Sequence, residues 1–275
     1  MHKFLLSLFV SIFICSCTKT DDGPTVDQPD QVGRIKIENK SDFNSYYSSI
    51  DGIESKDLKG TLHDLIDNNK VLSYSNVWNA LMKTDEDPKN SNNVILIYTG
   101  RSQAKSYKDN GHNGEDAWNR EHVWAKSRGF GGYPDDVRGP STDIHHIRPA
   151  DRSVNTARYT KYFDNGGTPH SEATGCKYTS STWEPRDEVK GDIARMMFYM
   201  AVRYEGDDGY ADLELNDRIS SNYSLPYIGM LSTLKEWHKQ DPVDDFEKKR
   251  NQTIYSIQGN RNPFIDHPEF AGYIW

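Results

Sequence analysis

Residues 119–132 read NREHVWAKSRGFGG and place a carboxylate, Glu121, directly before an imidazole, His122. Neighbouring side chains on a regular strand point to opposite faces, so the two groups can serve one site only where the strand ends or bends. The glycine-rich sequence that follows supplies the flexible backbone for such a bend. The stretch therefore predicts a strand end at which an acid and a base are presented together.

A second stretch, residues 141–165, reads STDIHHIRPADRSVNTARYTKYFDN. Its IHHI sequence predicts a short strand, and residues 151–167 predict a helix that stops at an Asn-Gly-Gly sequence. Asn155 and Arg158 are three residues apart, so on that helix they share one face. The two stretches together concentrate carboxylate, imidazole, amide and guanidinium groups in one part of the chain.

The order of these segments is similar to that in a known family. NREHVWAKS followed by DIHHIRPADRSVNTARYTKYF resembles the bacterial endonuclease I family of extracellular and periplasmic nucleases, which belongs to the His-Me finger (ββα-metal) nucleases. NVILIYTGRS and GDIARMMFYMAVRYEG also look like family segments, so the resemblance runs from about Ser45 to Phe270. It implies an α+β fold: a mostly helical single domain around a ββα-metal centre.

The same resemblance implies a reaction and roles for individual residues. His122 matches the general base, and Glu121 and Asn155 match the two protein ligands of a single Mg²⁺, for which Mn²⁺ or Ca²⁺ could substitute. Arg158 would meet the same phosphate. Such an enzyme hydrolyses DNA with little sequence preference and leaves 5′-phosphate ends; RNA stays open as a second substrate. A neutral imidazole and an oxygen-bound divalent ion suit this chemistry, because hydrolysis needs a deprotonated water and compensation of phosphate charge.

Each residue also has a structural interpretation. His122 could be a core histidine, Asn155 a residue that caps a helix start, and Arg158 a salt-bridge partner. On a strand, one of His145 and His146 would face the site and the other would face the core. For these two histidines, orienting a residue that binds the metal is favoured over binding the metal directly. Arg138 and Arg148 are further candidates for contact with phosphate, but the sequence does not indicate where they lie in the site.

Two other functions remain alternatives. His122, His145 and His146 could bind zinc as three nitrogen ligands, although the His-Glu-x-x-His pattern of many zinc proteases does not occur in the sequence. The chain could also be a non-catalytic surface lipoprotein that binds nucleic acid or glycan. The expected partners are thus nucleic acid and a membrane, and no obligate protein partner is indicated.

The formal net charge of −8 at first argues against binding to phosphate. Its distribution removes the objection, because residues 101–161 hold 11 Lys and Arg against 8 Asp and Glu. The positive balance therefore falls on the segment that carries the histidines.

The N-terminus reads MHKFLLSLFVSIFICSC, a basic residue and then an apolar run too short to span a bilayer permanently. Residues 1–16 resemble a lipoprotein signal peptide in which Cys17 becomes the lipidated first residue; an ordinary signal peptide with a chance cysteine is the alternative. Residues 17–40 then form a lipid-anchored flexible tether, and residues 41–275 form the nuclease domain. An exported lipoprotein, periplasmic or on the cell surface, is expected.

Several other elements follow from periodicity. Apolar residues at helical spacing predict helices over 54–69, 76–83, 192–206, 228–238 and 243–258, the last ended by Gly259. The apolar run at 94–100 predicts a buried strand. Cys176 would be alone after processing, so we expect a small core side chain without chemistry.

Overall fold

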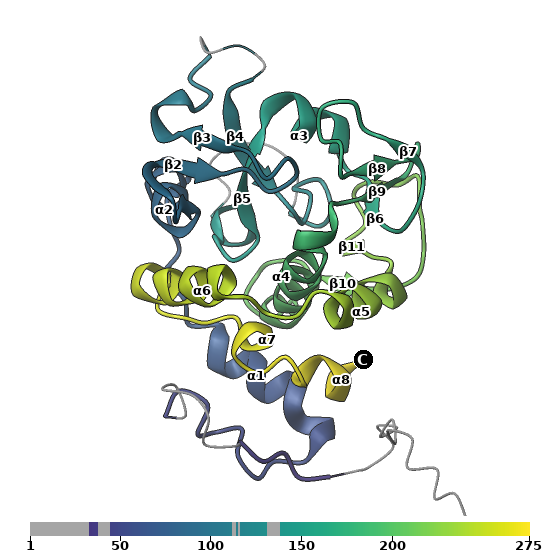
Figure 1. The fold of residues 1–275 in the computed structure, drawn as a ribbon. Helices are drawn as coiled ribbons and strands as arrows, with labels where there is room; N and C mark the ends of the chain where they lie inside the picture. The colour runs from purple at the N-terminus through teal and green to yellow at the C-terminus, as the bar shows by residue number, and fades with distance from the viewer. Residues whose placement is uncertain (1–32, 38–44, 112–113, 115, 131–137) are drawn as a thin grey trace, which may run out of the picture. The chain divides into compact units, whose positions relative to one another are not determined.

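The centre of the fold is a strand–strand–helix unit made by the two stretches that opened the sequence analysis. In a computed structural model, β4 (Trp118–His122) pairs antiparallel with β5 (Ile147–Asp151), and α3 (Arg152–Arg158) follows at once (Figure 1). The register places Glu121 opposite Arg148 and His122 opposite Ile147. β4 ends at His122, so the predicted strand end is confirmed.

The structure describes residues 33–37, 45–111, 114, 116–130 and 138–275. Within these residues the remaining strands are short and form small sheets: β1 (Glu86–Asp87), β2 (Asn90–Ile95), β3 (Ser102–Ala104), β6 (Tyr162–Phe163), β7 (Thr168–Pro169), β8 (Lys177–Tyr178), β9 (Thr182–Glu184), β10 (Glu214–Leu215) and β11 (Tyr227–Ile228). The other α-helices are α1 (Leu58–Ile66), α2 (Tyr74–Thr84), α4 (Lys190–Arg203), α5 (Leu231–Gln240), α6 (Asp245–Gln258), α7 (Pro263–Asp266) and α8 (Phe270–Ile274). The α+β class is confirmed.

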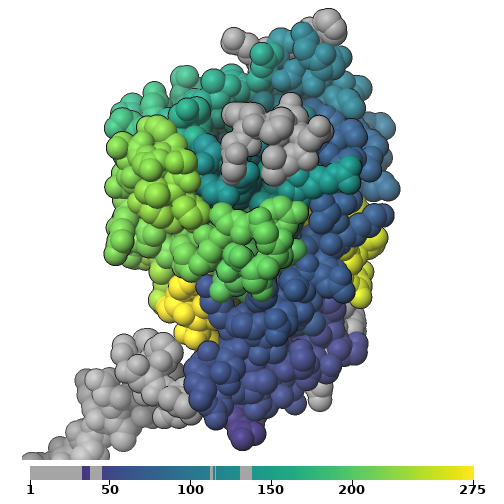
Figure 2. Space-filling view, turned by 180° about the vertical axis from the view of Figure 1, so that it is seen from behind, coloured from purple at the N-terminus to yellow at the C-terminus, as the bar shows by residue number. Residues whose placement is uncertain are grey.

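Helix α4 forms the middle of the helical part. All fourteen of its residues are buried, and it packs against α1, α5 and α7 (Figure 1). Seen from behind, C-terminal residues in yellow lie against the blue N-terminal residues (Figure 2), in agreement with the packing of α8 on α1. The methionine stripe of α4 is core, because Met196, Met197 and Met200 are all buried. Burial of this kind is the main favourable contribution to folding.

Most of the predicted helices are present with shifted ends. The helix over 54–69 is α1, preceded by the 3₁₀ turn Ser55–Asp57. α2 starts at a Ser73 cap, whose hydroxyl accepts the amide of Asn76. α6 ends at Gly259, whose φ of +85° is the left-handed conformation that glycine adopts without strain. Cys176 is a buried free thiol, as expected.

The run at 94–100 is not one strand, because β2 ends at Ile95. The backbone turns there instead: the Leu96 amide donates to Arg101 O at 2.9 Å and the Gly100 amide to Leu96 O at 2.8 Å. Apolar content reported the burial of this run correctly, but not its backbone path.

The IHHI sequence is a turn rather than a strand, and only its last residue, Ile147, belongs to β5. Side chains form hydrogen bonds with backbone groups that would otherwise pair with a neighbouring strand. The Asp143 carboxylate accepts the His145 amide at 3.0 Å, and Arg250 donates to the carbonyls of Ile144 and Ile147 at 2.6 and 2.8 Å. Such local and long-range side-chain bonds compete with strand pairing.

The helix predicted over 151–167 stops at Arg158. Tyr159 has a φ of +53°, which ends the helix, and its amide donates to Asn155 O. The chain then enters β6, so the Asn-Gly-Gly sequence lies in a later loop and is not the helix stop.

The folded part begins earlier than residue 41. Residues 33–37 pack on the domain, where the Ile35 amide donates to Ile53 O at 2.8 Å and the Ile35 side chain is buried. Residues 33–37 therefore belong to the domain and not to the tether. Residues 1–16, expected to be a signal peptide, and Cys17, the expected lipidation site, lie outside the described residues. No helix in the described part of the chain is long and apolar enough to cross a membrane.

Candidate active site

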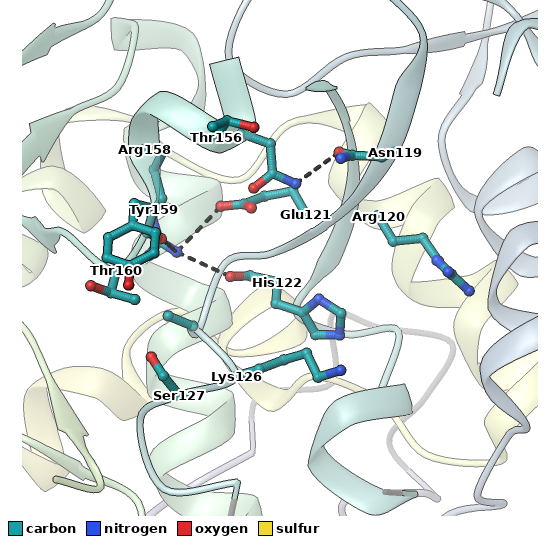
Figure 3. A pocket seen from close by; sticks show the side chains of 12 residues that line it. Asn119, Arg120, Glu121, His122, Lys126, Ser127, Thr156, Arg158, Tyr159 and Thr160 are labelled. Carbon is teal, nitrogen blue, oxygen red and sulfur yellow. Dashed lines mark hydrogen bonds and ion pairs between the residues drawn. The ribbon is translucent and has the colours of Figure 1, made fainter. Parts of the chain in front are cut away.

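A pocket of about 350 Å³ lies where β4 ends beside α3 (Figure 3). It is lined by residues of β4 and the turn after it, and by the C-terminal half of α3 with the residues that follow: Asn119, Arg120, Glu121, His122, Ala125, Lys126, Ser127, Asn155, Thr156, Arg158, Tyr159 and Thr160. The structure thus brings together the four residues expected to carry the chemistry, Glu121, His122, Asn155 and Arg158. Arginine and lysine side chains on this wall favour an anionic ligand.

Glu121 is a buried carboxylate with one oxygen occupied and one open. Its Oε1 accepts a hydrogen bond from the Tyr98 hydroxyl at 2.6 Å and lies 3.4 Å from Nη1 of Arg158. Its Oε2 has no hydrogen-bond donor among the described residues. Burial raises the pKa of Glu121, and the opposing influences of Arg158 and Tyr98 do not cancel it. A cation at the open oxygen would offset the cost of this burial.

His122 is held in one tautomer by a backbone carbonyl. Its Nε2 lies 3.0 Å from Ser141 O, a contact in which the ring nitrogen must donate. Nδ1 is therefore the acceptor in the neutral ring, and no donor in the described part of the chain engages it. Burial lowers the pKa of His122 well below its ordinary value, and His146 adds to the effect. The imidazole is neutral near pH 7 and able to accept a proton.

Figure 3 shows how the end of β4 presents the acid and the base. The Glu121 carboxylate and the His122 imidazole point away from each other on the two sides of the backbone, and both line the pocket. The ring of Tyr74 stacks on His122 with centroids 6.1 Å apart. Both groups therefore line one pocket from the two sides of the strand end, where they can act on different parts of one ligand.

Asn155 lies on the side of the pocket formed by α3. Its Nδ2 donates to Oδ1 of Asn119 at 2.7 Å, which points its own Oδ1 away from that contact. This carbonyl oxygen has no protein donor among the described residues. Asn155 is not the residue that caps α3, since the helix begins at Arg152. Glu121 Oε2 and Asn155 Oδ1 are the open oxygen atoms expected of a pair of Mg²⁺ ligands.

Arg158 is buried and directs its guanidinium at the backbone that carries His122. Nη1 donates to His122 O and Tyr159 O, both at 3.1 Å, and Nη2 donates to Val123 O at 2.5 Å. Figure 3 shows its contacts with His122 and Glu121 as dashed lines. The printed contacts anchor the arginine at the end of β4, while its buried Nε has no hydrogen-bond partner among the described residues.

The sequence did not decide which of His145 and His146 lies near the site. In the structure His146 lies next to His122, and His145 lies in the core. His146 lies beside His122 with ring centroids 5.7 Å apart; its Nε2 donates to Pro140 O at 2.7 Å. His145 lies in the core, 4.2 Å from the ring of Tyr199 between centroids, and its Nε2 contacts Asn260. Burial lowers the pKa of each to about 4.

These positions do not favour a three-histidine zinc site, because His145 faces away from His122. The described residues contain no cluster of three or more His, Cys, Asp or Glu side chains that could hold a metal ion. An ion in this pocket would rely on one carboxylate and one amide, with water and phosphate filling the other positions.

The two other arginines lie outside the pocket. Arg148 is buried in ion pairs with Asp85 and with Asp192, the latter at 3.1 Å, and is not available to a phosphate. Arg138 is exposed and precedes the 3₁₀ turn Gly139–Thr142.

Three residues of the site were missed from the sequence. Tyr98 holds Glu121, Ser141 fixes the tautomer of His122 through its backbone, and Asn119 orients Asn155. Tyr98 is 23 residues and Ser141 19 residues from its partner, so no local pattern marks either contact. Asn119 alone had a signal, because it stands two positions before Glu121 on the same face of a strand.

Comparison with known proteins agrees with this arrangement. The family model described as Endonuclease I matches residues 54–269. The chain is 60% identical over 236 residues to an extracellular ribonuclease of Bacillus subtilis (strain 168), covering 86% of this chain and 80% of that protein. It is 57% identical over 246 residues to an extracellular ribonuclease of Bacillus amyloliquefaciens, covering 89% and 83%.

More distant relatives carry a different substrate in their names. An extracellular deoxyribonuclease of Aeromonas hydrophila is 30% identical over 141 residues, which cover 49% of this chain and 54% of that protein. The family match spans the pocket, both strands of the central unit and its helix. The chain belongs to the endonuclease I family of nucleases.

Proposed function

We propose that the protein is an endonuclease that needs a divalent metal ion and hydrolyses phosphodiester bonds in RNA and DNA with little sequence preference. One observation carries the proposal: Glu121 Oε2, Asn155 Oδ1 and His122 Nδ1 are acceptors without protein donors and belong to residues lining one pocket. Phosphate contacts carry no base information, which favours weak sequence preference.

Glu121 and Asn155 would hold the ion, which we take to be Mg²⁺, with Mn²⁺ or Ca²⁺ as substitutes. Both ligands are oxygen atoms, and two protein ligands leave most of an octahedral shell to water and phosphate. When bound, Mg²⁺ supplies positive charge to the phosphoryl oxygens and to the departing oxygen. The Tyr98 hydroxyl keeps Glu121 oriented from the other side.

His122 would take the proton of the attacking water at Nδ1. The Ser141 carbonyl keeps the other ring proton on Nε2, so the lone pair stands at the atom that must accept. A general base in the correct tautomer contributes about 10²- to 10⁴-fold to a rate. Arg158 acts through position: it holds the carbonyls on both sides of the turn out of β4 and touches Glu121.

The relatives support RNA, which the sequence left open as a second substrate beside the expected DNA. The two that cover most of the chain are named ribonucleases, and the more distant one is named a deoxyribonuclease. RNA is therefore proposed as a substrate on equal terms with DNA.

The test is cleavage of single-stranded RNA and of plasmid DNA in Mg²⁺ and in EDTA, beside a His122→Ala variant. We expect cleavage that needs the metal and falls about 10²- to 10⁴-fold in the variant. Undiminished cleavage by the variant would remove His122 as the base. Binding that survives EDTA without any product would instead favour the non-catalytic lipoprotein.

We also propose export and a lipid anchor at Cys17, as the apolar run before it and the extracellular relatives support. The full chain would partition with membranes, and a Cys17→Ser chain would be released to the soluble fraction. Membrane association that persists in Cys17→Ser would contradict the anchor.

A further inference from the structure

A second pocket adjoins the first and shares two of its lining residues. It has a volume of about 220 Å³, and Tyr159 and Thr160 line both pockets. Figure 3 shows these two residues at the edge of the first pocket near Arg158, on the side opposite Arg120. The two pockets therefore meet at Tyr159 and Thr160.

The wall of the second pocket carries large rings that face water. Tyr159 is 63% exposed and Tyr223 47% exposed, and their rings meet edge to face with centroids 6.0 Å apart. Ile219 in the same wall is 51% exposed. An isolated exposed aromatic is ordinary, but a group of them beside an active-site pocket is typical of a binding surface.

Tyr159 is held in this position at a conformational cost. It is the only non-glycine residue in the described part of the chain with a positive φ, at +53°. Arg158, which also holds the carbonyls of His122 and Val123, donates to Tyr159 O at 3.1 Å. Strained residues of this kind cluster at ligand sites. One guanidinium thus fixes both the end of β4 and the backbone that presents the Tyr159 ring.

A buried cation, Arg128, packs beneath the aromatic residues of the pocket. The Arg128 guanidinium stacks on Tyr162 at 3.9 Å from the ring centroid and lies 5.7 Å from that of Tyr223. It also donates to Thr160 O at 2.8 Å, so its position is fixed. Four serines also line the pocket: Ser180, Ser181, Ser220 and Ser221.

These features match one planar, π-rich group on a chain of phosphates. The volume lies below the range of about 300–1,000 Å³ that encloses a drug-sized ligand, which suits a single ring system. Aromatic side chains combined with cations bind the bases of single strands, because every base has a π face. A base inside a duplex is already stacked and would have to leave the helix to enter.

We propose that the pocket of Tyr159 and Tyr223 binds an unpaired nucleobase next to the phosphodiester that is cleaved. This inference rests on the proposed nuclease function and adds a substrate preference to it. The enzyme should therefore act faster on single-stranded than on double-stranded RNA of the same sequence.

The experiment measures kcat/KM on a single-stranded RNA and on its duplex in Mg²⁺, for the unmodified protein and for Tyr223→Ala, Tyr223→Phe, Tyr159→Gly and Tyr273→Ala. Glycine at 159 removes the ring and tolerates the positive φ. Tyr273, 46% exposed on α8 away from both pockets, is the matched control. Affinity for the single strand in EDTA, by fluorescence anisotropy, gives a readout that needs no cleavage.

We expect Tyr223→Ala and Tyr159→Gly each to lose about 5- to 150-fold on the single strand, the range of one base–aromatic stack, and much less on the duplex. Tyr223→Phe and Tyr273→Ala should keep both activities. The melting temperature of Tyr159→Gly should be unchanged or higher, which separates loss of the ring from loss of fold.

Equal losses on both RNAs, or no loss on either, would overturn the base-binding pocket while leaving the nuclease function intact. If the unmodified protein cleaved neither RNA, the proposed ribonuclease activity would fail. The anisotropy measurement would then decide the pocket alone: weaker single-strand binding by Tyr223→Ala would support it, and equal binding would overturn it.

Discussion

Two buried groups of acids and arginines lie on the two strands of the central unit, and they differ in what they leave open. Around Arg148 on β5, the guanidinium contacts Asp85 and Asp192, and Arg250 adds a contact to Asp85 at 3.4 Å. Thr84 donates to the second oxygen of Asp85 at 2.7 Å. On β4, Glu121 has Arg158 and Tyr98 at Oε1 and no protein donor at Oε2.

The difference separates a structural network from a functional one. In the Arg148 network each carboxylate near the arginine is paired, since an unpaired charge in the interior is costly. In the pocket, Glu121 keeps one oxygen without a protein donor. Arg158 donates its hydrogen bonds mainly to backbone carbonyls. Residue identity alone does not distinguish the two cases; the completeness of the hydrogen bonding does.

The largest expected effect comes from breaking each network at its arginine. Arg148→Met removes from two buried carboxylates, Asp85 and Asp192, the guanidinium that they share and should lower the free energy of unfolding by about 3–5 kcal/mol. Arg158→Met should also destabilise, because it removes donors from the carbonyls of His122 and Val123. Only Arg158→Met should lower activity per folded molecule, by about 10- to 100-fold, since small displacements of catalytic groups have effects of that order.

Urea unfolding and specific activity at equal folded concentration measure the two quantities separately. An Arg148→Met protein that lost as much specific activity as Arg158→Met would break the distinction between the networks.

The pH dependence of stability tests whether His145 is a structural residue of the core. Burial lowers the pKa of His145 from 6.5 to about 4. Between these pH values the ring is protonated in the unfolded chain and neutral in the folded chain. The protein is therefore fully stabilised by this residue above about pH 6.5 and loses stability as pH falls toward 4. The loss is about 3 kcal/mol, from about 1.4 kcal/mol per pH unit.

The measurement is the free energy of unfolding in urea at pH 7 and at pH 4.5, for the unmodified chain and for His145→Gln. The variant should lose clearly less stability on acidification, because it lacks the titrating ring. Identical losses in both proteins would show that His145 does not titrate as its burial requires.

The sequence predicted well wherever local pattern controls structure. Helical periodicity identified α1, α4 and α6, and the Gly259 stop is present because its conformation excludes other residues. The Glu121–His122 pair was placed correctly at a strand end, since the glycine-rich segment is a local signal.

Long-range side-chain bonds explain what the sequence could not predict. Arg250 from α6 binds the carbonyls of the IHHI turn, and no periodicity in residues 141–165 reports a partner so far along the chain. Tyr98 reaches Glu121 from the end of a run that appeared to be only a strand. Arg158, expected at the phosphate, is used by backbone carbonyls that become neighbours only in the folded protein.

The most direct test of the account is calorimetric titration of Mg²⁺, or Mn²⁺ in its place, into the unmodified protein, Glu121→Gln and Asn155→Ala. Glu188→Gln is the control, since that carboxylate is 74% exposed and far from α3 in sequence. We predict about one ion bound per chain, affinity reduced at least about tenfold in Glu121→Gln and Asn155→Ala, and no change in Glu188→Gln. Unchanged affinity in Glu121→Gln, or no binding by the unmodified protein, would contradict the proposal that this pocket holds the metal.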